Sequence, residues 1–339
     1  MNVSFRTKSR HGYSVEFSPY YPQRLACATS QYYGLAGKYI VVLNGSKHTL
    51  PPPAIKLHIK FCCGTLFVLD ATPNGLVPLQ TYQWNDGLFE VTWSEGNENV
   101  LVAAAGDGSI LVWDVSQPQG PLKALKEHTK ETYSVHWSQT RNENLVISGS
   151  WDSLIKLWDI SQSSSLSTFE GHRSLVYSVR WSPHIPGCFV SASGDQTLCV
   201  WDIRKPQFAQ TVIPAHEAEI LTCDWCKYDQ NLVFSGAVDG TIRVWDIRNP
   251  QTPINQLLGH KLAVRRVKAS PHAGNILASC SYDFTTRVWD MTGPSALEVI
   301  EHHTEFVYGL DFNLHIPGQI ADCGWDELVH VFSPRSLQQ

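Results

Sequence analysis

Six times in this chain an aspartate is followed, six residues later, by a large aromatic residue. Five of the six aromatics are tryptophans that are themselves followed by aspartate, and successive Trp-Asp pairs lie 45, 43, 44 and 44 residues apart. A repeat of about 40–45 residues with this signature is typical of the four-stranded blades of a propeller. The six pairs are Asp107/Trp113, Asp152/Trp158, Asp195/Trp201, Asp239/Trp245, Asp283/Trp289 and Asp326/Phe332.

A histidine recurs 23 or 24 residues before the aspartate in five units, and a serine recurs four residues before it in four of them. In a blade, the aspartate lies on the tight turn between the second and third strands. It can accept a hydrogen bond from the histidine, which reaches the serine hydroxyl and the indole N–H. A catalytic Ser-His-Asp triad is needed only once, so recurrence with the period favours a buried structural network. Its predicted members are His128, Ser148, Asp152 and Trp158; His172, Ser191, Asp195 and Trp201; His216, Ser235, Asp239 and Trp245; and His260, Ser279, Asp283 and Trp289.

The number of blades predicted from these repeats is seven. Five units begin at a histidine, the last of them imperfect because Asp322 replaces the serine and Phe332 the tryptophan. A sixth unit has Trp84 in the histidine position, and a seventh opens at His11 and ends near Asp70.

Only seven residues follow Phe332, too few for the last strand of that blade, whereas the alternating segment 2–8 could supply it. Closure by the N-terminus would remove the open sheet edges. We therefore expect an all-β fold, a seven-bladed WD40 β-propeller closed by the N-terminal strand, as a single domain over residues 1–339.

One segment, residues 38–62, breaks the period. It adds about 25 residues where other blades need about two, and its deletion would join Gly37 to Cys63 with normal spacing. Long structureless loops are uncommon in compact domains. We interpret the segment as a non-native insertion, from a retained intron or an error in the gene model. The alternative is a surface excursion, and sequencing of the transcript would separate the two.

Composition restricts the classes of function. A formal net charge of −5 and a pI near 6.3 disfavour a nucleic-acid partner. Neither a signal peptide nor an apolar run of about 18 residues is evident, which predicts a cytosolic chain without direct membrane insertion. The nine cysteines are predicted to be reduced thiols. Cys223 and Cys226 have the spacing of half a metal site, but the sequence offers no second pair to complete it. No metal, cofactor or catalytic residue is expected.

The face that carries the tight turns is the candidate binding surface. We expect three positions per blade to point outward there: the third and fifth residues after the histidine, and the residue before the aspartate. They are rich in aromatics and carboxylates, with one clear base. Such a surface suits a helical peptide with an apolar stripe and a cation, although some aromatics could instead plug the channel. The candidate residues are Asp86, Phe89, Glu131, Tyr133, Trp151, Tyr177, Glu219, Tyr282, Phe306, Tyr308 and Trp325.

Several runs depart from the repeat consensus in specific ways, and on these the chain resembles the peroxin 7 family, cytosolic receptors for the type 2 peroxisomal targeting signal. The resemblance covers the whole chain except the insertion. The runs are residues 84–93, 181–189, 192–197, 214–228, 278–284 and 301–306.

The resemblance implies recognition of an N-terminal signal of the form Arg/Lys, Leu/Val/Ile, five residues, His/Gln, Leu/Ala. It also implies cargo enzymes such as a thiolase, a co-receptor such as the long form of the type 1 signal receptor, and docking at the peroxisomal import machinery. The protein would then cycle between cytoplasm and peroxisome. The alternative is a generic WD40 scaffold, such as a ubiquitin-ligase substrate adaptor or a histone-tail reader. An enzyme would need a set of residues outside the repeat register, and the sequence offers none.

Overall fold

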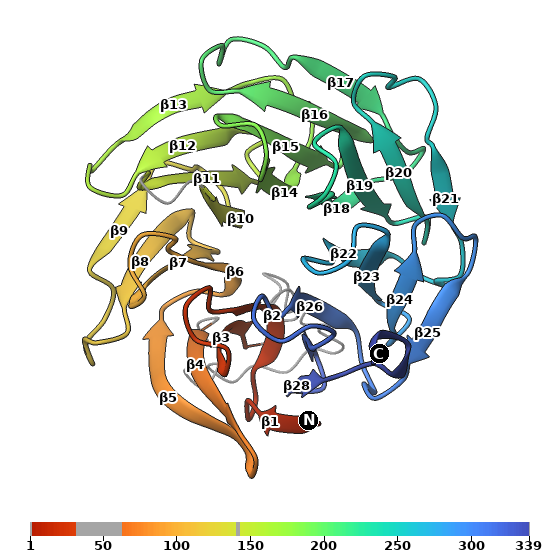
Figure 1. The fold of residues 1–339 in the computed structure, drawn as a ribbon. Coiled ribbons are helices and arrows are strands. Elements are labelled where there is room, and N and C mark those ends of the chain that lie inside the picture. Colours follow the sequence, from red (N-terminus) through yellow and green to blue (C-terminus); the bar gives the residue numbers. More distant parts are fainter. Residues whose placement is uncertain (1, 32–62, 140–142, 339) are drawn as a thin grey trace, which may run out of the picture.

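Seven four-stranded antiparallel sheets form a ring around a central axis, here called the channel, in the computed structural model, which describes residues 2–31, 63–139 and 143–338 (Figure 1). The predicted seven-bladed propeller is confirmed. The strand that opens each blade lies innermost, and in six blades the chain then moves outward by hairpins through all four strands (Figure 1). Each sheet thus presents one edge to the central axis.

The strands of the first four blades are β2 (His11–Phe17), β3 (Arg24–Ser30), β4 (Gly64–Thr72) and β5 (Gly75–Trp84); β6 (Leu88–Trp93), β7 (Val100–Ala105), β8 (Ser109–Asp114) and β9 (Lys123–Lys126); β10 (Thr132–Trp137), β11 (Leu145–Ser150), β12 (Ile155–Asp159) and β13 (Ser165–Phe169); and β14 (Val176–Trp181), β15 (Cys188–Ser193), β16 (Thr197–Asp202) and β17 (Thr211–Pro214). The remaining three consist of β18 (Ile220–Trp225), β19 (Leu232–Ala237), β20 (Ile242–Asp246) and β21 (Asn255–Leu257); β22 (Val264–Ala269), β23 (Ile276–Ser281), β24 (Thr286–Asp290) and β25 (Ala296–Ile300); and β26 (Val307–Phe312), β27 (Ile320–Gly324), β28 (Leu328–Phe332) and β1 (Val3–Arg6). A 3-10 turn, Arg335–Leu337, follows β28.

The N-terminal strand closes the ring, as the sequence predicts. β1 pairs antiparallel with β28, with Val3 opposite Val331 and Phe5 opposite Val329, so the two ends of the chain lie in one sheet (Figure 1). Phe5 also makes an edge-to-face contact with Phe67 of blade 1, with ring centroids 5.5 Å apart. Blade 7 is therefore completed by the chain terminus and anchored to its neighbour.

Residues 38–62, the predicted insertion, lie outside the described residues. The residues on either side are held together: the Gln31 N–H donates to the Cys63 carbonyl at 3.0 Å, and Ser30 pairs with Gly64 across β3 and β4. The chain thus leaves blade 1 and rejoins it at adjacent points of one hairpin. That the segment is non-native, and that residues 1–339 make one domain, stay predictions.

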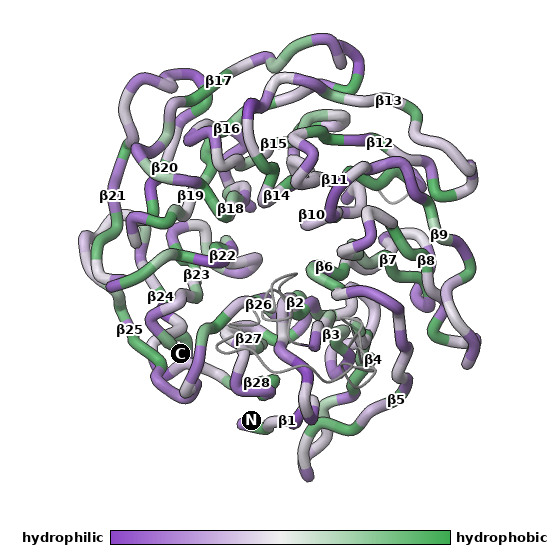
Figure 2. The backbone as a smooth tube through the Cα atoms, turned by 180° about the vertical axis from the view of Figure 1, so that it is seen from behind, coloured by the Kyte–Doolittle hydropathy of each residue, from purple (hydrophilic) through white to green (hydrophobic). Residues whose placement is uncertain are grey.

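Tryptophans at the ends of the inner strands join blades 2, 4 and 5 to the blade before them. The indole N–H of Trp93 donates to the Glu16 carbonyl at 3.1 Å. Trp181 donates in the same way to His136, at 3.0 Å. Burial of these rings between sheets supplies apolar contact, and the hydrogen bond fixes the indole orientation. Hydrophobic stretches recur in every sheet, seen in green from the opposite side (Figure 2).

The repeated histidine, serine, aspartate and tryptophan meet within each of blades 3 to 6. In blade 3, His128 Nδ1 lies 2.9 Å from Asp152 Oδ2, and Nε2 lies 2.8 Å from Ser148 Oγ. The Trp158 indole donates to the same serine oxygen at 2.8 Å, so it reaches the histidine only through the serine. The other three sets repeat this geometry: His172, Ser191, Asp195 and Trp201; His216, Ser235, Asp239 and Trp245; and His260, Ser279, Asp283 and Trp289.

Candidate peptide interface

A β-bulge near the start of every inner strand shapes the mouth of the channel on the face that carries the tight turns. In blade 3, for example, Thr132 pairs with Ser150 and Ser134 with Gly149, so that Tyr133 has no pairing partner. A bulge bends the strand and redirects the extra side chain. The same shift occurs in all seven blades, and the skipped residues, here called the bulge ring, are Tyr13, Phe89, Tyr133, Tyr177, Leu221, Arg265 and Tyr308.

The aromatic members of the bulge ring form one cluster with the residues that sequence analysis places around them. Tyr13, Phe89, Tyr133 and Tyr308 are buried, and five partly buried aromatics pack against them. Ring centroids 4.9 to 6.0 Å apart connect Tyr13 to its aromatic neighbours. The five outer members are Trp151, Tyr177, Tyr282, Phe306 and Trp325.

The expectation that all three positions per blade point outward is wrong for most of the bulge ring. Tyr133 and Tyr308 are each 7% exposed and Phe89 is fully buried, because the bulge turns these side chains towards the channel axis. The burial of these three residues agrees instead with the alternative, in which some of the aromatics fill the channel. The half-buried residues above them, Trp151, Tyr282, Phe306 and Trp325, form the accessible part of the aromatic cluster.

The single base in this set is also buried. Arg265 is 1% exposed, and its guanidinium carbon lies 4.9 Å from the Tyr133 ring centroid and 5.0 Å from that of Tyr308. Its nitrogens have no hydrogen-bond partner among the described residues. Aromatic faces attract a cation through their quadrupole, which accounts for this position. The positive charge is therefore enclosed by the cluster and is not presented on the surface.

Two carboxylates lie beside the cluster on blades 2 and 3. Asp86 is half-buried, and its Oδ1 accepts the Gly87 N–H at 2.7 Å. Burial raises the pKa of the Asp86 carboxyl, and the nearby charges of Asp107 and Glu131 raise it further. The negative charges at this edge of the cluster thus oppose one another, and a cation placed here would relieve that repulsion.

A third carboxylate, Glu219, lies on blade 5 and is exposed. It accepts a hydrogen bond of 2.9 Å from the Tyr177 hydroxyl of blade 4. Burial and the Glu219 charge raise the pKa of the Tyr177 hydroxyl well above its ordinary value, so this tyrosine remains a donor. The cluster therefore has acidic groups on two sides.

Other residues of this surface are absent from the eleven candidates. Tyr13 belongs to the bulge ring. It was not among the candidates because the insertion interrupts the first repeat, so that this repeat aligns only loosely with the others. Phe284 is exposed and contacts the Phe306 ring at 5.7 Å, next to the cluster. Exposed bases on the loops that follow the network histidines were also missed, because they lie outside the three positions considered: Lys130, Arg173 and Lys261.

Below the bulge ring, Glu90 forms an ion cluster that crosses the channel. Its carboxylate accepts hydrogen bonds from Arg180 of blade 4 and Arg266 of blade 6. Burial opposes ionisation, but the two guanidinium groups outweigh it and hold the pKa of Glu90 well below its ordinary value. The sequence gives no sign of this cluster, because its members come from three repeats at positions without a motif.

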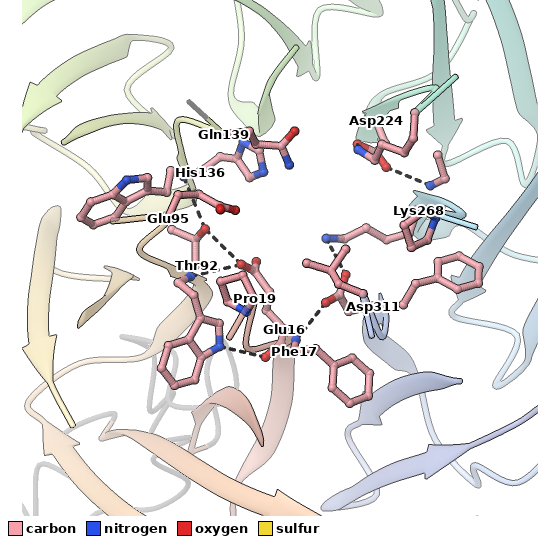
Figure 3. Close-up of a pocket in the computed structure, with 17 residues that line it drawn as sticks. Glu16, Phe17, Pro19, Thr92, Glu95, His136, Gln139, Asp224, Lys268 and Asp311 are labelled. Carbon is pink, nitrogen blue, oxygen red and sulfur yellow. Dashed lines mark hydrogen bonds and ion pairs between the residues drawn. The ribbon is translucent and has the colours of Figure 1, made fainter. Parts of the chain in front are cut away.

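A cavity of about 80 Å³ lies at the other end of the channel, where the inner strands finish (Figure 3). Glu16, Lys268 and Asp311 point into it, with Lys268 Nζ 3.0 Å from an oxygen of Asp311. Glu16 accepts from the Thr92 hydroxyl and the Trp93 N–H at 3.2 and 3.1 Å. Burial raises the pKa of the Glu16 carboxyl to about 7. None of the eleven candidate residues lines this cavity.

The described part of the chain bears on the cysteines and on membrane-spanning segments. Its eight cysteines, which include Cys223 and Cys226, are all free. Within the same residues, no helix has the length and apolar character required to span a membrane.

Comparison with known proteins identifies the repeats and the relatives of the chain. The family model described as WD domain, G-beta repeat matches residues 119–159, 163–202, 208–246 and 251–290, each of which holds the last strand of one blade and three strands of the next. The chain is 54% identical to the Peroxisomal targeting signal 2 receptor of Mus musculus over 334 residues, which span 98% of this chain and 97% of the relative. It is 55% identical to the Homo sapiens protein of the same name over 187 residues, 55% of this chain and 50% of the relative. The Arabidopsis thaliana protein named Peroxisome biogenesis protein 7 is 39% identical over 135 residues, 39% of this chain and 35% of the relative.

Proposed function

The chain belongs to the family of peroxisomal targeting signal 2 receptors, and from this premise we propose that it binds the signal helix of peroxisomal matrix enzymes and delivers them for import. The relatives are named as receptors, and the fold is a propeller, so the proposed role is binding without chemistry. Membership of this family favours this role over that of a generic scaffold.

The observation that supports a particular site is the aromatic cluster with carboxylates on its edge. The signal expected for this family has its defining residues at positions i, i+1, i+7 and i+8. Seven residues of α-helix complete almost two turns and rise about 10.5 Å, so these four side chains lie on one stripe. The apolar members of that stripe would pack on Trp151, Phe306 and Trp325, which are only partly buried.

The cation of the signal would lie over Asp86 and Glu131. Burial, and to a lesser extent the charges of Asp107 and Glu131, already penalise the charge on Asp86. An arginine or lysine placed there would offset this penalty, and complementary charge also speeds encounter. Glu219, fixed by Tyr177, offers a second acceptor for a polar side chain further along the helix.

The partners of this role are also part of the proposal. A co-receptor would cover the side of the helix that faces away from the propeller and link the complex to the docking machinery at the peroxisome. The receptor would then cycle between cytoplasm and peroxisome, with thiolase-like enzymes as cargo.

The direct test is a titration of the full chain against a fluorescent peptide that carries the type 2 signal, with and without co-receptor. Saturable binding that strengthens with co-receptor, and is lost when the Leu and the Arg of the signal are replaced, is the expected result. A histone-tail reader would tolerate replacement of the Leu, because it would need only the basic residues. A folded protein that ignores the signal peptide in both conditions would contradict the proposal.

A further inference from the structure

Blade 7 departs from the repeat at four positions that meet at one point. Asp322 occupies the serine position and Phe332 the tryptophan position of the network. His302 precedes the network histidine His303, and His330 lies two residues before Phe332. The residues that precede the network histidine in blades 3 to 6 are Glu127, Gly171, Ala215 and Gly259, and those two before the tryptophan are Lys156, Cys199, Arg243 and Arg287.

Two imidazoles contact the Asp322 carboxylate, and the third, His330, lies against both of them. His302 Nε2 lies 2.8 Å from Asp322 Oδ2, and His303 Nε2 lies 3.0 Å from Asp322 Oδ1. The rings of His302 and His330 have centroids 4.2 Å apart. One ring nitrogen from each of the three histidines lies within 4.8 Å of the other two.

One buried ring nitrogen of the three histidines, His330 Nε2, has no hydrogen-bond partner among the residues that the structure describes. A buried polar atom without a partner is costly, and it suggests a missing ligand. In β28, His330 is directly opposite Asp322 of β27, so the backbone register directs both side chains to the same face of the sheet.

The orientation of His303 is also that of a metal ligand. Its Nδ1 lies 2.8 Å from Asp326 Oδ2, so that nitrogen can donate its proton and leave Nε2 facing the cluster. Metal-binding histidines commonly donate their second ring N–H to a carboxylate, which fixes the tautomer and raises ligand basicity.

We propose that His302, His303, His330 and Asp322 bind a zinc ion, with Asp326 as the group that orients His303. Three imidazoles and a carboxylate suit Zn²⁺, which prefers four such ligands at about 2.0–2.2 Å in a tetrahedron. Ligand atoms in that geometry are about 3.3 Å apart. The three histidine nitrogens, which lie within 4.8 Å of one another, must therefore close by up to roughly 1.5 Å when the ion binds.

The ion has a route to the site and would connect the ends of the chain. A hollow of about 350 Å³ reaches His302 and His330 from solvent and is also lined by Val3 and Ser4 of β1. Ser4 pairs with His330 across β1 and β28. Zinc would thus bind at the sheet that closes the ring, so its affinity should be coupled to the stability of that closure.

The test is a titration of the purified full chain with Zn²⁺ alone, in competition with a chromophoric chelator, together with the melting temperature. We expect one equivalent to bind and the melting temperature to rise. His302→Gln and His330→Gln should each weaken binding by about 100-fold or more and abolish the rise. Asp326→Asn, which changes only the orienting group, should weaken binding by roughly 10- to 100-fold.

Two matched variants act as controls. His315→Gln alters an exposed histidine outside the cluster, and Cys63→Ser removes a half-buried thiol; both should bind zinc like the parent chain. His302 is partly exposed, so His302→Gln should fold, which its melting temperature without zinc will verify. Stoichiometric binding that survives both cluster substitutions, or the absence of stoichiometric binding in the parent chain, would overturn the proposal and leave the cluster as hydrogen bonds alone.

Discussion

The Tyr177 hydroxyl donates a 2.9 Å hydrogen bond to Glu219, and this contact joins blade 4 to blade 5 beside the aromatic cluster. The tyrosine ring packs against the cluster, while its hydroxyl sets the position of a carboxylate that would otherwise be free to rotate. One residue thus contributes both apolar surface and the orientation of a charge.

Replacement of Tyr177 by Phe should reduce affinity for the signal peptide by about 0.5–1.5 kcal/mol, because the ring remains while Glu219 loses its donor. Peptide titration measures this change. Tyr282→Phe is the matched control, since it removes a hydroxyl that bonds to Tyr308, 2.9 Å away, and not to a carboxylate. Equal losses in the two variants would show that orientation of Glu219 is unimportant.

Replacement of Glu131 by Lys should leave the fold intact and weaken peptide binding by roughly 1–3 kcal/mol, because it puts a cation where the cation of the signal is proposed to lie. Glu98→Lys makes the same charge change on the exposed turn between β6 and β7, at the other end of the channel, and should have little effect. If Glu131→Lys binds like the parent chain, the groove lies on other blades.

Asp195→Ala should lower the free energy of unfolding by about 1–3 kcal/mol, since His172, the Arg173 N–H and the Thr197 hydroxyl lose their acceptor. Urea denaturation measures the loss. Asp107→Ala is a matched change in blade 2, where the aspartate accepts from the Ser109 N–H and the network histidine is missing, so its cost should be smaller. An Asp195→Ala chain of undiminished stability would contradict the structural role of the network.

Glu90→Gln should cost about 3–5 kcal/mol of folding free energy. Loss of the carboxylate leaves the buried charges of Arg180 and Arg266 without their shared counter-charge. Equilibrium denaturation gives the value, and a variant as stable as the parent would show that the ion cluster contributes little.

Glu16→Gln should instead stabilise the folded protein at high pH. The pKa of the Glu16 carboxyl is raised from 4.5 to about 7 by burial, so between those values the folded state holds a proton that the unfolded state has lost. Stability supplied by this group is therefore lost as pH rises from about 4.5 to about 7. Glutamine keeps the acceptor for Thr92 and Trp93, so the variant should be more stable than the parent at pH 8 and similar at pH 4. Identical curves for the two chains would contradict the raised pKa.

The sequence predicted the blades and the ring closure, because both follow from spacing that repeats along the chain. It also identified the aromatics of the candidate face, whose part in binding stays a prediction. It could not predict which of those aromatics are buried. The bulge position holds Tyr133, Leu221 and Arg265 in different blades, so no residue type marks it, and only the pairing register shows that the side chain turns inward.

The ion cluster and the histidine cluster were missed for a related reason. Glu90, Arg180 and Arg266 are far apart in sequence and meet only because the ring brings their strands around one channel. His302 and His330 look like irregularities of a degenerate repeat until the register of β27 and β28 brings them to Asp322. Contacts between repeats are invisible to a pattern that is read within a repeat.

The pairing of β1 with β28 also constrains how the molecule folds. Val3 and Val331 are 328 residues apart along the chain, and their contact is the most non-local step in forming the ring. Loop closure over such a length is slow, and until it occurs β28 presents an unpaired strand edge to other molecules. The sheet that makes the finished ring stable is therefore also the part of the nascent protein most exposed to aggregation.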